Sequence, residues 1–300
     1  MAAPRLGFVG FGEAGSRIAM GLREAGVEGI WAYDIAADSE RVRRRSEESG
    51  VRLAATNAEL AGRCEVMFSV VTAASAVEAA RQNGPHLGAG HTYIDCNSVS
   101  PAKKCEIAAV IRAGAGRFVE GAILAPVPKK RGQGVEMLVN GDGAAELLER
   151  LAPLGFSMEA VAGAIGTAAG IKMCRSIVVK GLEALLTELV LAASRFGAEE
   201  RVFASLDQAY PGIEWKKLAD YMVNRVAMHG ERRAREMEEV AATLRTVGVE
   251  PMMSEAAARR QDWAAKLGLA GRFGAEGPST YREVLEIIES MEKAGGIGVK

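Results

Sequence analysis

Apolar residues in the first half of the chain follow two alternating patterns. Short runs rich in β-branched and aromatic residues predict strands, and the segments between them carry apolar residues at helical spacing. The expected strands are 6–10, 29–34, 51–54, 66–71, 92–95, 118–120, 137–140 and 156–160. The expected helices are 13–25, 39–49, 75–81 and 101–113. This alternation predicts an α/β fold with a doubly wound parallel sheet covered by helices on both faces.

The second half of the chain shows only the helical pattern. After about residue 163 we expect helices at 168–196, 199–209, 214–228, 231–247, 254–267 and 278–293, separated by glycine and proline. The sequence therefore predicts two domains. An α/β domain should cover residues 1–162, and an all-α helical domain that begins with one long helix should cover residues 163–300. The glycine-rich end at 295–298 is expected to fray.

Composition adds mainly exclusions. Of 300 residues, 49% are hydrophobic and 25% are charged, which is typical of a globular protein. The 37 Lys and Arg residues are balanced by 38 Asp and Glu residues, so there is no basic surplus for nucleic acid or an anionic membrane. The apolar stretch 177–193 should not span a bilayer, because it contains Lys180, Glu183 and Glu188. The apolar run at 6–10 is too short for a signal peptide, so we expect a soluble, cytoplasmic protein.

The cysteines and histidines argue against a metal site. Four cysteines without a C-x-x-C pair and three histidines do not fit a structural zinc site or a disulfide framework. We therefore expect no metal, and we expect the thiols to be small buried apolar groups. They belong to Cys64, Cys96, Cys105 and Cys174.

The first predicted strand runs into a turn that fits the dinucleotide-binding pattern G-x-G-x-x-G, namely Gly10-Phe11-Gly12-Glu13-Ala14-Gly15. Gly10 permits a tight turn, Gly12 leaves room for a pyrophosphate, and Gly15 lets the following helix pack closely. The phosphates would lie against the free amides and the positive end of that helix. Because a strand precedes the turn and a helix follows it, we expect a Rossmann-type fold. The alternative is a glycine-rich turn in an unrelated parallel sheet.

Asp34 ends the next predicted strand, 19 residues after Gly15, where a carboxylate would bind ribose hydroxyls. Its negative charge would repel the additional phosphate of NADP, so we expect NAD as the cofactor. The basic run 41–45 leaves NADP open as the alternative, because a helix pointing back could bring an arginine to that phosphate. We favour a solvated helix face on which these arginines pair with Glu40, Glu47 and Glu48.

Three further segments resemble motifs of one enzyme family. Asp95-Cys96-Asn97-Ser98-Val99-Ser100-Pro101 resembles its D-x-S-T-x-x-P substrate loop, and Phe118-Val119-Glu120-Gly121-Ala122 stands where it has a second substrate strand. Gly166-Thr167-Ala168-Ala169-Gly170-Ile171-Lys172 resembles the start of its interdomain helix, which carries the catalytic lysine. The family is the β-hydroxyacid dehydrogenase superfamily, which includes 3-hydroxyisobutyrate and 6-phosphogluconate dehydrogenases. The segment 232–239 resembles a phosphogluconate-dehydrogenase-like branch of it.

The resemblance implies an NAD-dependent oxidoreductase that transfers a hydride between the nicotinamide and a small hydroxy acid or related alcohol. Lys172 would be the catalytic general acid and base, and its apolar sequence neighbours should lower its pKa by desolvation. The implied substrate-binding residues are Asn97, Ser98, Gly121, Ala122, Ser176 and His229. The implied cofactor contacts outside the glycine turn and Asp34 are Val71, Thr72 and Asn97. A homodimer whose helical domains pack together is also implied.

The sequence departs from the family pattern at positions that affect the substrate. Asn97 replaces the first serine of the loop, and Ser176 stands where asparagine is usual, four residues after the lysine. Leu124-Ala125-Pro126 replaces the S-G-G donors that hold a substrate carboxylate, and a proline lacks the main-chain N–H. Val179 replaces the second acid of phosphogluconate dehydrogenase, so oxidative decarboxylation is not expected. A bulkier or less polar hydroxy compound fits this pattern better.

The residues leave other interpretations open. Lys172 could simply cover apolar helix surface with its stem. Arg232 and Arg233 could clamp an anionic group, although we favour an exposed helix that carries salt bridges. Imine reductases share the fold but usually carry Asp or Tyr in place of the lysine. A dinucleotide-binding sensor without catalysis would also keep the glycine turn.

Overall fold

The computed structural model describes residues 4–124, 135–274 and 277–294. Its contacts divide the chain into two compact units, Met1–Met173 and Cys174–Lys300. The border lies later than the predicted one at 162/163. The start of the long helix is therefore part of the α/β unit.

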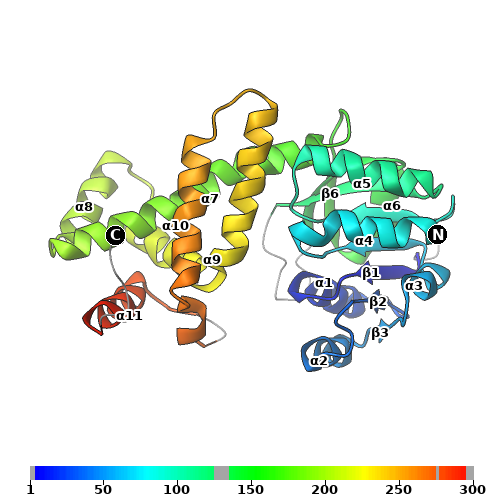
Figure 1. Ribbon diagram of the computed structural model, residues 1–300, viewed down its shortest axis with the longest axis horizontal. Coiled ribbons are helices and arrows are strands. Elements are labelled where there is room, and N and C mark those ends of the chain that lie inside the picture. Colours follow the sequence, from blue (N-terminus) through cyan, green and yellow to red (C-terminus); the bar gives the residue numbers. More distant parts are fainter. Residues whose placement is uncertain (1–3, 125–134, 275–276, 295–300) are drawn as a thin grey trace. The chain divides into compact units, whose positions relative to one another are not determined.

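An eight-stranded sheet runs through the described part of the α/β unit in the order β3-β2-β1-β4-β5-β6-β7-β8 (Figure 1). Strands β1 to β6 pair in parallel, which confirms the predicted Rossmann-type arrangement. The strand order reverses between β1 and β4, and ligands bind at the carboxyl ends of the strands beside such a reversal. The strands are β1 (Leu6–Val9), β2 (Trp31–Tyr33), β3 (Arg52–Leu53), β4 (Val66–Ser69), β5 (Thr92–Asp95), β6 (Arg117–Ile123), β7 (Val135–Gly141) and β8 (Phe156–Ala160).

The last two strands run opposite to the parallel strands β1 to β6. β7 pairs with β6 in antiparallel register, with Glu120 opposite Asn140, and β8 is parallel to β7. A parallel neighbour for β6 would need a crossover of a dozen or more residues, usually a helix. The sequence between the two strands, 124–134, contains two prolines and two glycines and is too short for a helical crossover. The predicted parallel sheet is therefore present, and the pair of β6 and β7 is its one antiparallel pair among the described strands.

Helices cover both faces of the sheet. On one face, α1 (Glu13–Glu24), α2 (Glu40–Ser49) and α6 (Ala144–Leu151) pack against the core around Phe8 and Phe68. On the other face, α3 (Asn57–Arg63), α4 (Ala76–Asn83) and α5 (Pro101–Ala113) pack around Tyr93 and Phe118. Because both faces are covered, β1, β4 and β5 are buried at every position.

Two helices of this unit, α3 and α6, are missing from the elements expected from the pattern. α3 begins after Thr56, whose hydroxyl accepts a hydrogen bond from the Glu59 N–H at 3.1 Å. The Glu59 carboxylate in turn accepts one from the Ala55 N–H at 2.9 Å. A threonine followed three residues later by glutamate is a capping signal, so this helix start was visible in the sequence. Short 3₁₀ turns occur at Ala73–Ser75, Gly84–His86, Ala152–Leu154 and, in the helical unit, Leu269–Arg272.

The helical unit confirms the predicted all-α second half. It contains most of α7 (Thr167–Arg195), together with α8 (Glu199–Ala209), α9 (Trp215–Thr246), α10 (Met252–Lys266) and α11 (Tyr281–Lys293). α9 and α10 run side by side (Figure 1). Tyr281, Val223 and Leu186 lie in the core of this unit. None of the helices among the described residues has the length and apolar composition that crossing a membrane requires.

α9 is kinked where the sequence predicts a break between two helices. His229 has φ −134° and ψ 16°, which are not helical values. A Cβ atom on the next residue, Gly230, would lie 2.7 Å from the main-chain oxygen of Gln261 on α10. The two backbones therefore approach too closely for a side chain at this position. The predicted helices 214–228 and 231–247 are the two arms of one bent helix.

The four cysteines are free thiols, and they differ in exposure. Cys64 and Cys96 are buried, as expected, whereas Cys105 and Cys174 are exposed, which corrects the expectation for those two. Within the described ranges, no cluster of three or more His, Cys, Asp or Glu residues could hold a metal ion.

Candidate active site

The glycine turn between β1 and α1 requires glycine at two positions for steric reasons. Gly10 has φ +86°, and a Cβ atom there would lie 2.6 Å from Cγ1 of Val71. A Cβ atom on Gly15 would lie 3.0 Å from the Gly10 oxygen. The turn is therefore tight, and α1 packs close to the end of β1.

Gly12 is different, because its side-chain position is open. A Cβ atom on Gly12 would meet nothing within 4 Å. Gly12 is also the N-cap of α1, and no side chain caps this end of the helix. The first amides of α1 and the open space above Gly12 form the kind of cradle that a pyrophosphate occupies. These residues fit a dinucleotide.

Asp34 lies beside this turn, as the spacing predicts. Its Oδ2 accepts a hydrogen bond from the Phe11 N–H at 2.7 Å, and its Oδ1 accepts one from the Ala36 N–H at 2.8 Å. The Gly10 N–H donates to the Tyr33 main-chain oxygen at 2.8 Å. These bonds join the ends of β1 and β2. Each carboxylate oxygen keeps a lone pair that a ribose hydroxyl could use.

Val71 and Thr72 follow β4, the strand next to β1. The contact of Val71 with Gly10 brings Val71 to the glycine turn. Thr72 is exposed, and its hydroxyl shares a hydrogen bond of 2.9 Å with the Ser75 hydroxyl. The contacts of both residues with a cofactor stay predictions.

The loop after β5 contains the predicted substrate residues Asn97 and Ser98. Ser98 is half-buried, and Asn97 is buried and hydrogen-bonded to Ser69 at 2.9 Å and to Asp95. Below the loop lies Lys104, which the sequence reasoning missed. Its position was visible in the spacing of α5, because Lys104 precedes the buried face formed by Ile107, Ala108 and Ile111.

Glu120 on β6 is a second buried charge that sequence reasoning missed. One oxygen of its carboxylate accepts hydrogen bonds from the Gly166 N–H at 2.9 Å and the Ala168 N–H at 3.1 Å. The other accepts one from the Ala169 N–H at 3.4 Å. A carboxylate stabilises the positive amino end of a helix, so Glu120 anchors the start of α7 on the sheet. The signal was a glutamate within an apolar strand.

Lys172 lies in the second turn of α7 and is half-buried. Its neighbours Ile171, Cys174 and Arg175 are exposed, so the apolar surroundings inferred from the sequence are incomplete. Burial raises the pKa of Cys96 to about 12, and the positive charges of Lys104 and Lys172 oppose this rise. The start of α7 lies beside the loop after β5, because Gly166 packs against Pro101.

Gly121 and Ala122 are buried in β6 rather than open to solvent. A Cβ atom on Gly121 would lie 2.7 Å from the Met137 sulfur, and Ala122 packs against Ala168 at the start of α7. Their predicted role in substrate binding stays a prediction. Leu124 is half-buried, and the other two residues of the predicted apolar wall, 125–126, lie outside the described residues.

A buried polar network surrounds Lys180 in the helical unit. Its ammonium donates to the Ser176 hydroxyl at 2.9 Å and lies 3.1 Å from a Glu236 carboxylate oxygen. Burial lowers the pKa of Lys180, although Glu236 opposes the change. Ser176 is thus buried and hydrogen-bonded within this unit, and His229 is half-buried at the kink of α9. Their predicted substrate contacts stay predictions.

Arg233 belongs to the same network, which corrects the expectation of an exposed helix face. It is 7% exposed, and its guanidinium lies 3.1 Å from the Glu183 carboxylate. Burial raises the pKa of Glu183 to about 7 against the opposing charge of Arg233. Arg232 is exposed as expected and pairs with Glu236 at 2.7 Å. The two arginines differ because consecutive residues point to different faces of a helix.

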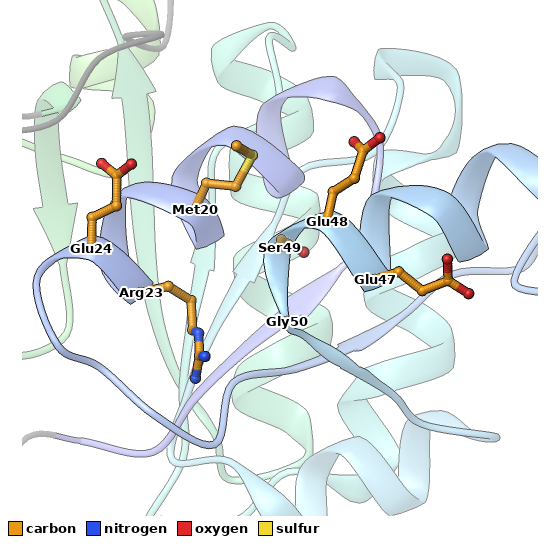
Figure 2. A pocket seen from close by; sticks show the side chains of 7 residues that line it. All are labelled: Met20, Arg23, Glu24, Glu47, Glu48, Ser49 and Gly50. Carbon is orange, nitrogen blue, oxygen red and sulfur yellow. The ribbon is translucent and has the colours of Figure 1, made fainter.

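A shallow hollow lies between the carboxyl ends of α1 and α2 (Figure 2). It is lined by Met20, Arg23, Glu24, Glu47, Glu48, Ser49 and Gly50. The glycine turn lies at the opposite, amino end of α1. The hollow is therefore separate from the candidate cofactor site.

Comparison with protein families identifies the α/β unit. Residues 5–166 match the family described as the NAD binding domain of 6-phosphogluconate dehydrogenase. The chain belongs to the β-hydroxyacid dehydrogenase superfamily. This confirms the resemblance seen in the motifs, and it makes the α/β unit of this superfamily member an NAD(P)-binding domain. Residues 193–264 match a domain of unknown function, DUF1932.

Several proteins resemble this superfamily member over most of its length. A conserved hypothetical protein from Sinorhizobium meliloti 1021 is 38% identical, with a TM-score of 0.68 over 87% of this chain and 88% of that chain. A conserved protein described as structurally similar to 3-hydroxyacid dehydrogenases is 32% identical, with a TM-score of 0.68 over 89% of this chain and 99% of that chain. An uncharacterised protein of Methanothermus fervidus is 28% identical over 83% of this chain and 94% of its own.

More distant structures share the fold alone. A 3-hydroxyisobutyrate dehydrogenase from Salmonella typhimurium is 19% identical, with a TM-score of 0.70 over 94% of this chain and 99% of that chain. A reductive aminase from Aspergillus terreus is also 19% identical, with a TM-score of 0.57 over 90% and 96%.

Proposed function

We propose that this superfamily member is an NAD-dependent dehydrogenase or reductase of a small hydroxy acid or related alcohol, with Lys172 as the general acid and base. The nicotinamide would supply the hydride acceptor or donor. Lys172 would take the hydroxyl proton during oxidation and return it during reduction. Asn97 and Ser98 would contact the substrate from the loop after β5.

One observation carries this proposal: Gly166, which directly precedes the helix of Lys172, packs against Pro101, which follows the loop of Asn97 and Ser98. An ammonium near the loop that follows a central strand is in reach of a ligand bound at the carboxyl edge of the sheet. The hydrogen bonds of Glu120 to the first amides of α7 support the same role, since they fix the helix on which Lys172 lies.

We propose NAD rather than NADP as the cofactor. Asp34 would face the ribose hydroxyls, and its charge disfavours an additional phosphate there. The arginines of α2 are less suited to bind the additional phosphate of NADP, because two of them already pair with carboxylates. Arg43 pairs with Asp38 at 3.0 Å, and Arg44 pairs with Glu48 at 3.3 Å.

The experiment begins with a thermal-shift screen of hydroxy acids and alcohols in the presence of NAD, because a ligand of the native state raises the melting temperature. With a substrate in hand, Lys172→Met should lower turnover by about 10²–10⁴-fold and leave NADH affinity nearly unchanged. Lys217→Met, which removes an exposed lysine from α9, is the matched control. Full activity of Lys172→Met would overturn the proposed mechanism.

An imine reductase-like activity is the second candidate, and the reductive aminase that shares the fold favours it. Lys172 argues against it, because imine reductases usually carry Asp or Tyr at this position. Oxidation of NADPH or NADH by the protein with a ketone and an amine, and not with the ketone alone, would favour this candidate. A non-catalytic sensor would bind the dinucleotide and would catalyse neither the dehydrogenase nor the imine reductase reaction.

We also propose that the protein is a homodimer formed through α7. Within the helical unit, Val178 and Leu185 are 63% and 54% exposed, and their spacing of seven residues puts them on one face of the helix. The same face of a second copy would bury them. Val178→Glu should convert the dimer to a monomer in light scattering after size exclusion, whereas Glu188→Gln should not. A monomeric wild-type protein would contradict this proposal.

A further inference from the structure

A lysine that the proposed mechanism does not use is buried at the carboxyl end of β5. Lys104 is 1% exposed. Its ammonium donates to the Asp95 main-chain oxygen at 2.6 Å and to Oδ2 of the Asp95 carboxylate at 2.5 Å. It also donates to the Gly121 main-chain oxygen at 3.5 Å. Lys104 therefore ties the ends of β5 and β6 together and commits its donors to them.

The Asp95 carboxylate transmits this constraint to Asn97. The amide nitrogen of Asn97 donates to Oδ1 of Asp95, and it donates to the Ser69 hydroxyl at 2.9 Å. A carboxylate that is paired with an ammonium only accepts hydrogen bonds, so the nitrogen and not the oxygen of the amide must face Asp95. Both N–H donors of the amide are then engaged by β4 and β5.

Within the described part of the chain, these contacts leave the amide oxygen of Asn97 without a hydrogen-bond donor. Asn97 is 4% exposed, and no donor to its Oδ1 is found among the residues that the structure describes. Buried side-chain oxygens normally accept a hydrogen bond. Asn97 follows the carboxyl end of β5, and the glycine turn follows the carboxyl end of β1. Doubly wound sheets bind their ligands at the carboxyl ends of their strands.

We propose that Lys104 is a positioning residue that, through Asp95, makes Asn97 an acceptor-only contact for the bound ligand. The contact selects a neutral hydrogen-bond donor, either the carboxamide N–H of the nicotinamide or the hydroxyl of the substrate. It does not recognise a carboxylate, which has no donor to offer. The inference rests on the proposed function, because it specifies the ligand chemistry of the same site.

This arrangement explains what changes when Asn97 replaces the serine of the family pattern. A serine hydroxyl can donate a hydrogen bond to a substrate carboxylate. The amide of Asn97 cannot do so, since its N–H groups are held by Asp95 and Ser69. This position therefore favours a substrate that is not bound there through an acid group.

The first arm of the test compares the affinities of NAD and of its 3-acetylpyridine analogue, in which a methyl group replaces the carboxamide NH₂. If the nicotinamide is the donor, the wild type should bind NAD about three- to tenfold more tightly, as expected for one neutral hydrogen bond. Lys104→Met and Asn97→Leu should bring this ratio close to one. Lys103→Met, which removes the preceding lysine of α5, should keep it.

The second arm applies if the wild type binds both nucleotides equally, because the donor is then the substrate hydroxyl. The probe is 3-hydroxybutyrate compared with its O-methyl ether, each titrated against the NADH complex by thermal shift. The hydroxy compound should bind more tightly in the wild type and in Lys103→Met. This preference should vanish in Lys104→Met and Asn97→Leu.

A preference that persists in Lys104→Met and Asn97→Leu would overturn the inference, and so would the absence of any preference of the wild type in both arms. If Lys104 and Asn97 had a purely structural role, their substitution would weaken the binding of both probes of a pair alike and leave the ratio of the two affinities unchanged. If Lys104→Met does not fold, Lys104→Gln takes its place, and Asn97→Leu tests the acceptor with the Lys104–Asp95 pair intact. A wild type that binds neither nucleotide would instead overturn the proposed function.

Discussion

Pro101 lies directly against Gly166, since a Cβ atom on Gly166 would be 2.8 Å from the Pro101 Cβ. Gly166 also has φ +101°, a backbone conformation that residues other than glycine rarely adopt. Pro101 begins α5 immediately after the loop of Asn97, and Gly166 immediately precedes α7. The contact thus joins the predicted substrate loop to the helix of Lys172 within the α/β unit.

Gly166→Ala should destabilise the protein, because the new methyl group would meet Pro101 and the backbone would be strained. We expect the free energy of unfolding to fall by about 2–4 kcal/mol in urea denaturation. Gly21→Ala is the matched control, since a Cβ atom on Gly21 in α1 meets nothing within 4 Å. It should leave stability unchanged or raise it by up to about 1 kcal/mol. Equal stability of Gly166→Ala and the wild type would contradict the close contact.

Gly12→Val should separate cofactor binding from folding. The valine would meet no protein atom at its Cβ, so the melting temperature should change little. It would fill the space of the pyrophosphate, so NADH affinity should fall more than about tenfold in a fluorescence titration. Gly10→Val should instead impair folding, because its Cβ would lie 2.6 Å from Val71. Normal NADH binding by Gly12→Val would show that the cofactor does not lie on this turn.

Asp34→Ser should reduce the preference for NADH over NADPH. The serine removes the charge that repels the additional phosphate, while its hydroxyl can still accept one of the two main-chain N–H groups. Titration of both nucleotides measures the ratio of affinities. Asp38→Ser is the control, because Asp38 is an exposed acid nearby that pairs with Arg43. A wild type that prefers NADPH would refute the role assigned to Asp34.

Glu183 should make the stability of the helical unit depend on pH. Its pKa is raised from 4.5 to about 7 by burial. The folded state therefore binds more protons than the unfolded state between these values, and stability must fall as pH rises through this window. The loss is at most about 3 kcal/mol, and it is complete above pH 7.

Urea denaturation at pH 5 and pH 8 tests this for the wild type and for Glu183→Gln, which cannot ionise. The stability of the wild type relative to Glu183→Gln should be lower at pH 8 than at pH 5. Glu188→Gln, on the exposed face of the same helix, should show the same pH dependence as the wild type. A constant difference between the wild type and Glu183→Gln would show that Glu183 keeps the same protonation state in the folded and unfolded chain.

The amino-acid sequence alone determined the parts of the protein that depend on local geometry. The turn depends on the positive φ of Gly10 and on the close approach of Gly15 to the Gly10 oxygen, and the carboxylate of Asp34 reaches it because strand length and spacing set the end of β2. α5 begins and ends as predicted, since Pro101 suits the first turn of a helix and Gly114 suits its end. Motif spacing and local residue preferences were enough to predict these features.

Only the tertiary structure decided where Lys104, Glu120 and Arg233 lie. A charged residue in the sequence is normally assigned to the surface, because burying an unpaired charge is strongly unfavourable. Each of these charges is buried against a specific partner: Asp95, the amides before and within α7, and Glu183. Such partners come together only when separate strands and helices have packed. The attraction between each charge and its partner offsets part of the loss of hydration, and no periodicity of the sequence encodes these pairings.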